Sequence, residues 1–243
     1  MEISLRRTIA KVAYRAIAKG ARVPNAKVIS DLAQWGKLID LTRALDINVF
    51  LDVGANRGFF SEHLRNAGYR GKIFSFEPIP EDHANIVRLS ASDINWSAQC
   101  FALGAENGTR NFHINTTEGQ TVLSSFLPMK NTCSELKIVP VQIRRLDSLL
   151  PSLVSGIEKP RIFLKMDTQG FDSQVMEGAT NCLDQVFGLQ SELSVTPLYE
   201  NMPHYTEALA NYEALGFQLM DMFVVNRTEN GAVLEYDCLM ARR

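Results

Sequence analysis

The chain has 243 residues, of which 46% are hydrophobic and 21% are charged, and this is the composition of an ordinary globular protein. Its 25 basic and 27 acidic residues give a net charge of −2, which argues against the broad positive field that nucleic-acid binders use. We therefore expect one domain with small additions and no nucleic-acid partner.

Positive charge is concentrated at the start of the chain. Residues 1–22 carry six Lys or Arg side chains against one Glu, a net charge of +5 that leaves −7 for the remainder. We find no apolar run long enough to span a bilayer and no secretory signal pattern, so we expect a cytoplasmic protein. If residues 1–22 are helical, their apolar stripe and cations would suit an anionic inner membrane surface or a lipid-linked substrate. Packing on the protein itself is the favoured alternative.

Helix-like and strand-like segments then alternate along the chain. Apolar residues recur at helical spacing first at 31–45, and then at 59–68, 81–91, 172–185 and 205–217. Apolar, β-rich runs predict strands at 49–55, 72–78, 96–104, 161–167 and 186–195. Continuous apolar strands that alternate with helices are typical of a mainly parallel, doubly wound α/β sheet. We predict such a domain over 46–243, preceded by a helical extension over 1–45.

Two regions interrupt the alternation. Residues 108–147 contain two strand-like runs around a polar loop, which predicts an inserted hairpin or lid. Near the end of the chain, two further strand-like runs are joined by Asn230 and Gly231, a pair that favours a tight hairpin turn. We therefore expect the C-terminal strands to be antiparallel.

A glycine loop follows the first predicted strand. Asp52, Gly54 and Gly58 form a D-x-G-x-x-x-G segment, which lacks the G-x-G-x-x-G spacing that binds a dinucleotide pyrophosphate. The two glycines allow a ligand to approach closely, and Asp52 suits a cationic group such as the ammonium of an amino acid moiety. S-adenosylmethionine has this ammonium beside its sulfonium.

The second predicted strand ends at Glu77, 19 residues after Gly58. A carboxylate at this position is placed to accept hydrogen bonds from both hydroxyls of a ribose. The alternative is that the glycines only make a tight turn and that Glu77 is a surface residue. Ala102, Leu103 and Gly104 close the third predicted strand, where they would pack on an adenine or simply belong to the core.

Acidic residues also follow the fourth and fifth predicted strands, where catalytic groups of open α/β sheets gather. Asp167 is expected to project into the crevice, whereas Asp172 is expected to cap the next helix. Glu192 lies in an apolar run and fits a paired core residue and a functional one equally well. Together, Asp167 and Glu192 would offer oxygen ligands to Mg²⁺.

A general base is needed if the reaction deprotonates an alcohol. Asp167 is the first candidate because it ends the fourth predicted strand. His204 is the second: it lies in a Pro- and Tyr-containing loop at 197–205 that is either a substrate wall or a plain surface loop. We expect the remaining histidines to be surface or packing residues.

These segments, taken in order from about Val49 to Met240, resemble the FkbM family of S-adenosylmethionine-dependent methyltransferases. The segments are FLDVGANRGFF, FSFEPIP, ALGAENGT, VQIRRLDSLL, FLKMDTQGFDSQVMEGA, SELSVTPLYENMP and EYDCLMAR. The VGANRG form combined with the K-x-D-x-x-G segment is the most specific part of the resemblance.

The resemblance implies a Rossmann-like class I methyltransferase sheet with an antiparallel last strand. It places the cofactor at Asp52, Gly54, Asn56, Gly58, Phe59, Glu77 and Pro78, and the reacting centre near Lys165, Asp167 and Glu192. One departure is Gln169, where the family frequently has Glu.

The family implies O-methylation of a sugar or glycan, including lipo-oligosaccharides and polysaccharides, or of a polyketide-type product. The alternatives are a nicotinamide-dependent reductase and a non-catalytic cofactor-binding or scaffold protein.

Overall fold

A computed structural model describes residues 26–116, 123–130 and 136–242. The chain divides into two compact units between Gly36 and Lys37, and this boundary falls inside helix α2 (Ala26–Ala44) rather than at residue 45. The basic segment 1–22, to which we assign the membrane prediction, lies outside the described residues. Within the described ranges, no helix combines the length and the apolarity needed to cross a bilayer.

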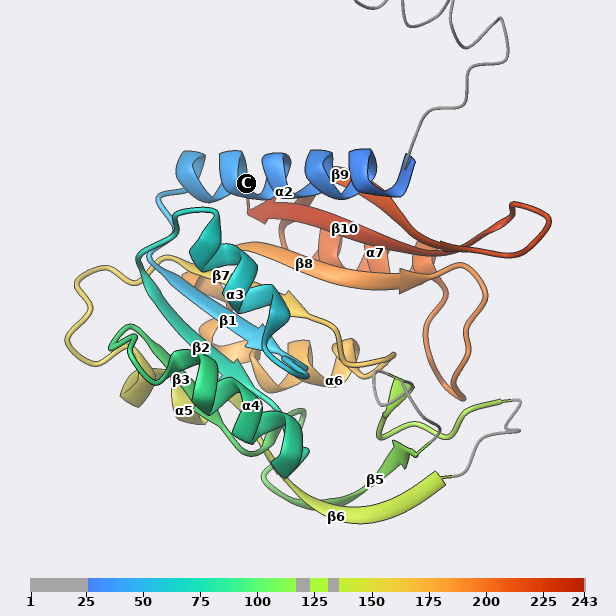
Figure 1. The fold of residues 1–243 in the computed structure, drawn as a ribbon, viewed down its shortest axis with the longest axis horizontal. Coiled ribbons are helices and arrows are strands. Elements are labelled where there is room, and N and C mark those ends of the chain that lie inside the picture. Colours follow the sequence, from blue (N-terminus) through green and yellow to red (C-terminus); the bar gives the residue numbers. More distant parts are fainter. Residues whose placement is uncertain (1–25, 117–122, 131–135, 243) are drawn as a thin grey trace, which may run out of the picture. The chain divides into compact units, whose positions relative to one another are not determined.

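The second unit is built on a seven-stranded sheet (Figure 1). Its strands follow the order β3 (Trp96–Gln99), β2 (Lys72–Phe76), β1 (Val49–Val53), β7 (Ile162–Met166), β8 (Val186–Ser194), β10 (Val233–Arg242) and β9 (Phe217–Arg227). The first five strands are parallel, whereas β10 runs antiparallel to β8 and to β9. The predicted antiparallel end of the chain is confirmed.

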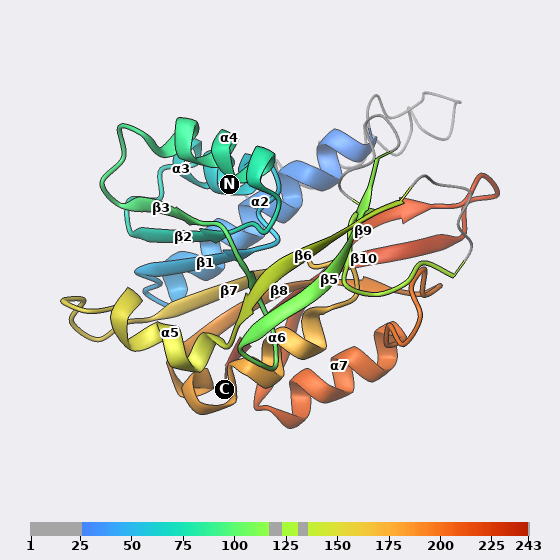
Figure 2. The same cartoon turned by 90° about the horizontal axis from the view of Figure 1, so that it is seen from below.

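Helices cover both faces of this sheet (Figure 2). α3 (Phe59–Asn66) and α4 (Pro80–Ser90) lie on one face, and α5 (Leu146–Leu153), α6 (Asp172–Gly178) and α7 (Tyr205–Ala214) lie on the other. Every residue of β1 and β7 is buried, as expected for central strands with both faces covered. The predicted doubly wound, Rossmann-like α/β fold is therefore confirmed.

Two helical segments differ from the sequence prediction. The helix predicted over 172–185 ends at Gly178 and continues as a 3₁₀ helix, η2 (Thr180–Gln185), in which Cys182 N donates to Ala179 O. Helix α5 was not predicted, although Leu146 and Leu150 bury one face of it at helical spacing. Pro151 lies inside this short helix, and because proline is disfavoured within helices the sequence does not indicate one here.

A second, three-stranded sheet lies apart from the large one (Figure 1). It contains β4 (Ala102–Leu103), β6 (Leu136–Arg144) and β5 (Gly108–Asn115), in that order, with β5 and β6 antiparallel. The prediction of one strand over 96–104 is wrong, because the chain leaves the large sheet after Gln99. Ala102 and Leu103 then pair with β6 instead.

An aromatic cluster joins the small sheet to the loop after β7. Phe126 packs between Phe112 on β5 and Phe171, with ring centroids 4.8 Å and 4.7 Å away. Ile143 on β6 completes this buried cluster. The small sheet is thereby held close to the carboxyl ends of the central strands, where the candidate site lies.

Candidate functional site

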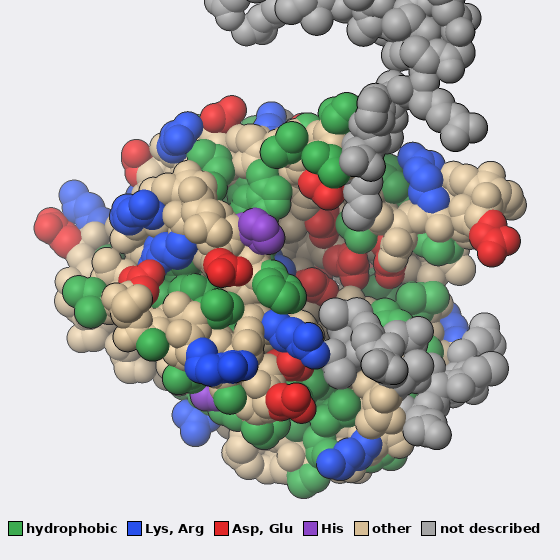
Figure 3. Space-filling model, in the orientation of Figure 1, with side chains coloured by type: hydrophobic (Ala, Val, Ile, Leu, Met, Phe, Trp, Pro, Cys, Tyr) green, Lys and Arg blue, Asp and Glu red, His purple; other side chains and the backbone are tan. Residues whose placement is uncertain are grey.

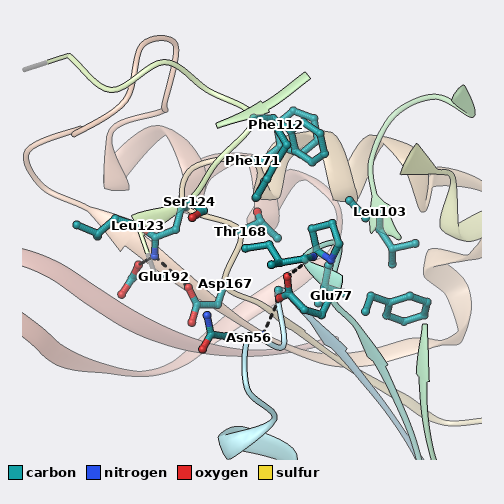
Figure 4. Close-up of a pocket in the computed structure, with 18 of the residues that line it drawn as sticks. Asn56, Glu77, Leu103, Phe112, Leu123, Ser124, Asp167, Thr168, Phe171 and Glu192 are labelled. Atoms are coloured by element: carbon teal, nitrogen blue, oxygen red, sulfur yellow. Dashed lines mark hydrogen bonds between the residues drawn. The ribbon is translucent and has the colours of Figure 1, made fainter. Parts of the chain in front are cut away.

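A cavity of about 240 Å³ lies at the carboxyl ends of the central strands (Figure 4). One part is formed by the ends of β1, β2 and β4 and is lined by Asn56, Glu77, Pro78, Ile79, Ala102 and Leu103. The other part is formed by the ends of β7 and β8, the C-terminal hairpin and segment 123–130, and is lined by Leu123, Ser124, Gln169, Glu192, Asn226 and Glu235. In Figure 4, Asp167 lies between the Glu77 side and the Glu192 side.

Glu77 is the buried carboxylate of the first part. Asn56 N donates to its Oε2 and Ile79 N donates to its Oε1, each at 2.8 Å. Burial raises the pKa of Glu77 to about 7, and the two N–H donors oppose that rise. Each carboxylate oxygen retains capacity for a further donor, so Glu77 can accept hydrogen bonds from a diol in the cavity.

The glycine loop shapes this part of the cavity, although not by direct ligand approach at both glycines. Gly54 has φ +71°, and a Cβ there would lie 2.0 Å from the backbone oxygen of Asp167. Gly58 has φ +85° and does not line the cavity; its Cβ would meet Ile86 of α4 at 3.2 Å. Gly58 therefore serves the packing of α3 on α4, which differs from the predicted contact with a ligand.

Of five further residues predicted to bind the cofactor, three line the cavity and two do not. Pro78, Ala102 and Leu103 line the cavity as expected. Gly104 does not line it, because the glycine faces Ile143, whose side chain a Cβ would meet at 2.4 Å. Phe59 is 56% exposed and also lies outside the lining.

Asp52 and Lys165 form an ion pair behind the glycine loop, and neither lines the cavity. They are register neighbours on β1 and β7, with Lys165 Nζ 3.2 Å from Asp52 Oδ1. Ser61 donates to Asp52 Oδ2 at 2.6 Å, and Lys165 donates to Gly54 O at 3.3 Å. Burial opposes the charge of Lys165, but Asp52 and Asp167 keep its pKa above the ordinary value. The structure therefore pairs Asp52 with Lys165 and leaves it outside the lining of the cavity.

Asp167 and Glu192 meet at the second part of the cavity, where Gln169 lies between them. Gln169 Nε2 donates to Asp167 Oδ1 at 3.1 Å and to Glu192 Oε2 at 3.0 Å. Burial, followed by the charges of Asp167 and Glu235, raises the pKa of Glu192 well above its ordinary value. Glu192 is therefore a cavity residue paired with Asp167 through an amide.

Asp172 does not cap the N-terminus of α6 as predicted. It accepts hydrogen bonds from the backbone N–H and the hydroxyl of Thr168, and from the hydroxyl of Ser191. These contacts close the loop that follows β7. Asp172 therefore fixes the backbone that carries Asp167 and Gln169 into the cavity.

His204 lies apart from this group. Its ring is exposed, its Nδ1 is 2.7 Å from Thr206 Oγ1, and it does not line the cavity. The structure therefore separates the second candidate base from Asp167 and Glu192.

Several cavity residues were not predicted from the sequence. Asn226 and Glu235 come from the C-terminal hairpin, where Asn226 Nδ2 donates to Glu235 Oε2 at 3.0 Å. Tyr199, which was also not predicted, lies outside the lining, and its hydroxyl is 3.1 Å from Gln169 Oε1 and 2.9 Å from Leu123 O. An acidic residue within an apolar, strand-like run is a sequence signal that could have identified Glu235. No motif marks Asn226 or Tyr199.

The charged side chains that line the cavity are acidic. None of the described residues that line the cavity carries a positive charge, whereas Glu77, Asp167, Glu192 and Glu235 carry carboxylates. Acidic side chains gather in a hollow of the surface shown in Figure 3.

The possibility of Mg²⁺ between Asp167 and Glu192 does not fit this arrangement. Both carboxylates accept hydrogens from the Gln169 amide, which occupies the position that a shared cation would need. Among the described residues, no group of three or more His, Cys, Asp or Glu side chains has the geometry to hold a metal ion.

The strand order, the glycine loop and the position of the cavity define a Rossmann-like methyltransferase. The model of the methyltransferase FkbM domain matches residues 52–219. The chain therefore belongs to the FkbM methyltransferase family.

A curated relative is the 2-O-methyltransferase NoeI of Sinorhizobium fredii (strain NBRC 101917 / NGR234), which is 27% identical over 203 residues, 76% of this chain and 77% of the relative. Among solved structures, methyltransferase FkbM from Methylobacillus flagellatus KT aligns at 15% identity and a TM-score of 0.47, covering 81% of this chain and 44% of that one. The fibrillarin pre-rRNA processing protein of Methanococcus jannaschii aligns at 10% identity and a TM-score of 0.48, covering 81% and 66%.

The buried pair of Lys165 and Asp52 predicts that Lys165 contributes to the stability of the fold rather than to the chemical step. Lys165→Met leaves Asp52 as an unpaired buried charge, so we expect the free energy of unfolding to fall by about 3–5 kcal/mol. Asp52→Asn/Lys165→Met removes both charges and keeps a polar partner for Ser61, so it should lose much less. Urea unfolding of both variants tests this, with Lys137→Met at an exposed lysine as the control. Equal stability of Lys165→Met and Lys137→Met would contradict the assignment.

Proposed function

We propose that this methyltransferase transfers a methyl group from S-adenosylmethionine to a hydroxyl of a sugar-type acceptor. The observation that carries the proposal is that a single cavity presents Glu77 at the end of β2 and Asp167 after β7. The Glu77 carboxylate can accept hydrogen bonds from the hydroxyls of a ribose, and the Asp167 carboxylate can accept the proton that an alcohol must lose.

The residues around Glu77 fit the proposed cofactor. Both Glu77 oxygens face backbone donors and keep lone pairs for the two ribose hydroxyls. Ile79, Ala102 and Leu103 supply apolar surface for an adenine beside it. S-adenosylmethionine, when bound, supplies an electrophilic methyl group. The glycine spacing and the family disfavour the nicotinamide alternative.

Asp167 is placed to act as the general base. Its side chain is 43% exposed and reaches the cavity, with Oδ1 bonded to Gln169 and Oδ2 3.6 Å from Lys165 Nζ. A carboxylate in this position can take the proton of an acceptor hydroxyl as the new C–O bond forms. Lys165 positions Asp167 from behind and does not reach the cavity lining.

The second part of the cavity, which we assign to the acceptor, has a polar lining that favours a polyhydroxylated ligand over an apolar one. Ser124, Asn226 and the carboxylates there offer hydrogen-bonding groups suited to a sugar, which carries several hydroxyls. The relative NoeI is named a 2-O-methyltransferase, which supports transfer to oxygen. A glycan or glycolipid fits this lining better than a polyketide-type product does.

The pKa of Glu77 predicts a pH dependence of cofactor binding. Ribose hydroxyls donate to the ionised carboxylate, and the pKa of Glu77 is raised to about 7, so affinity should fall as the pH falls through 7. Calorimetry with S-adenosylhomocysteine should show a Kd about tenfold weaker at pH 6 than at pH 8. Glu77→Gln should bind weakly with little pH dependence, whereas exposed Glu81→Gln should behave like the wild type. Binding of NADH instead of S-adenosylhomocysteine would overturn the cofactor assignment.

Replacing the proposed base should affect turnover rather than folding. Asp167→Asn retains the shape of the side chain, so we expect turnover on a panel of neutral methyl glycosides to fall by about 10²–10⁴-fold. Its melting temperature and S-adenosylhomocysteine affinity should stay close to wild type. His204→Ala serves as the comparison and should keep wild-type turnover. The reverse pattern would assign the base role to His204.

The acidic lining predicts selection by acceptor charge. A carboxylate or phosphate on the acceptor would face Asp167, Glu192 and Glu235, and like charges in contact are strongly disfavoured. We expect kcat/KM for a neutral methyl hexoside to exceed that for the matching uronic acid by at least about tenfold. Comparable values for the two acceptors would contradict this placement of the acceptor.

A further inference from the structure

A single amide group connects the two carboxylates of the acceptor part. Gln169 Nε2 donates one hydrogen to Asp167 Oδ1 at 3.1 Å and the other to Glu192 Oε2 at 3.0 Å. A primary amide nitrogen has two hydrogens, so both are used by this pair. The two carboxylates belong to different strands, because Asp167 follows β7 and Glu192 lies on β8.

The position of the Gln169 side chain is set by contacts on the opposite side of the amide and on its backbone. The Tyr199 hydroxyl lies 3.1 Å from Gln169 Oε1, which orients the oxygen away from the carboxylates. Ser125 Oγ donates to the Gln169 carbonyl at 2.8 Å. Gln169 has φ +53°, a left-handed conformation that a residue other than glycine adopts at a cost. The surrounding loop therefore determines where the amide points.

The charged groups that act on the two carboxylates differ. Asp167 faces a cation, because Lys165 Nζ on β7 lies 3.6 Å from its Oδ2. Negative charges face Glu192 from the neighbouring elements, namely Asp172 on α6 and Glu235 and Asp237 on β10. The Tyr199 hydroxyl completes the group. Two carboxylates in such surroundings tend to share a proton unless donors stabilise both charges.

We propose that Gln169 is a positioning residue, whose one amide nitrogen holds Asp167 and Glu192 as a pair and keeps Asp167 able to accept the acceptor's proton. The role in the reaction rests on the proposed function, whereas the pairing does not. Gln169 passes no proton itself: the hydroxyl hydrogen goes to Asp167, and the amide keeps both of its own hydrogens. Loss of the amide removes the hydrogen bonds that stabilise the two carboxylate charges and so makes Asp167 easier to protonate, and a protonated Asp167 cannot act as the base.

Carbon-detected NMR of the full chain tests the pairing without an acceptor or a methyl donor. The carboxyl carbons of Asp and Glu are labelled, and Asp167→Asn and Glu192→Gln assign the two resonances. Gln169→Leu removes both donors, so the titration midpoints of the pair should rise by about one pH unit or more. Gln142→Leu, at an exposed glutamine of β6 that bonds Thr109, is the control and should leave both midpoints unchanged.

A second substitution keeps the test decisive if Gln169→Leu does not fold. Gln169→Asn carries the same amide on a shorter side chain that cannot reach both carboxylates, so the midpoints should again rise. Unchanged midpoints in a folded variant at position 169 would overturn the proposal and leave Gln169 as a packing residue.

Kinetics then separate the pairing from the reaction. With neutral methyl glycosides as acceptors, the acidic limb of kcat/KM against pH should move upward in Gln169→Leu by the amount that NMR records. A limb that stays in place while the NMR midpoints rise would overturn the catalytic part of the proposal. A third outcome is that the wild type methylates none of the acceptors while the midpoints still rise in the variants at position 169. That result would support the pairing and would show that the proposed function is wrong.

Discussion

The buried ammonium of Lys165 is the interaction on which the arrangement of the site depends. It lies within 3.6 Å of Asp52 on β1, of the Gly54 carbonyl in the glycine loop and of Asp167 after β7. Removing Lys165 and Asp52 from water costs several kcal/mol per ion, and their mutual attraction offsets this cost only while this buried pair is intact. The loop that carries Asn56, which donates to Glu77, and the loop that carries Asp167 are therefore both held by contacts with this one cation.

Much of the fold could be predicted from the sequence because central parallel strands are buried on both faces and read as apolar runs. The same burial prevented a prediction of side-chain direction. All of β1 is buried, so no alternation of polar and apolar residues shows which way Asp52 points. Its partner depends on the register between β1 and β7, which two distant segments set together. The run at 96–104 was misassigned for a related reason, since β6 competes for its last residues.

The candidate site could be predicted where residues follow strand ends, as Glu77 and Asp167 do, because strand ends meet at one edge of the sheet. Their assigned roles remain predictions. Glu192 could be found as an acid in an apolar run, but its pairing with Asp167 could not. That pairing depends on Gln169, whose left-handed backbone has no local sequence signal, and on Tyr199 and Glu235 from later loops and strands. Tertiary contacts decide these positions.

The contact between Gly54 and the Asp167 carbonyl has a consequence for how such an enzyme can change. A Cβ at Gly54 would lie 2.0 Å from that oxygen, so the backbones of the two loops pack directly against each other. A change in the backbone of either loop would displace the other, so the glycine loop and the loop that carries Asp167 are expected to change together. The hairpin of β9 and β10 and the segment 123–130 take no part in this contact, yet they line the acceptor part of the cavity. New acceptors are most readily accommodated by changing these segments, because the methyl donor's loop stays as it is.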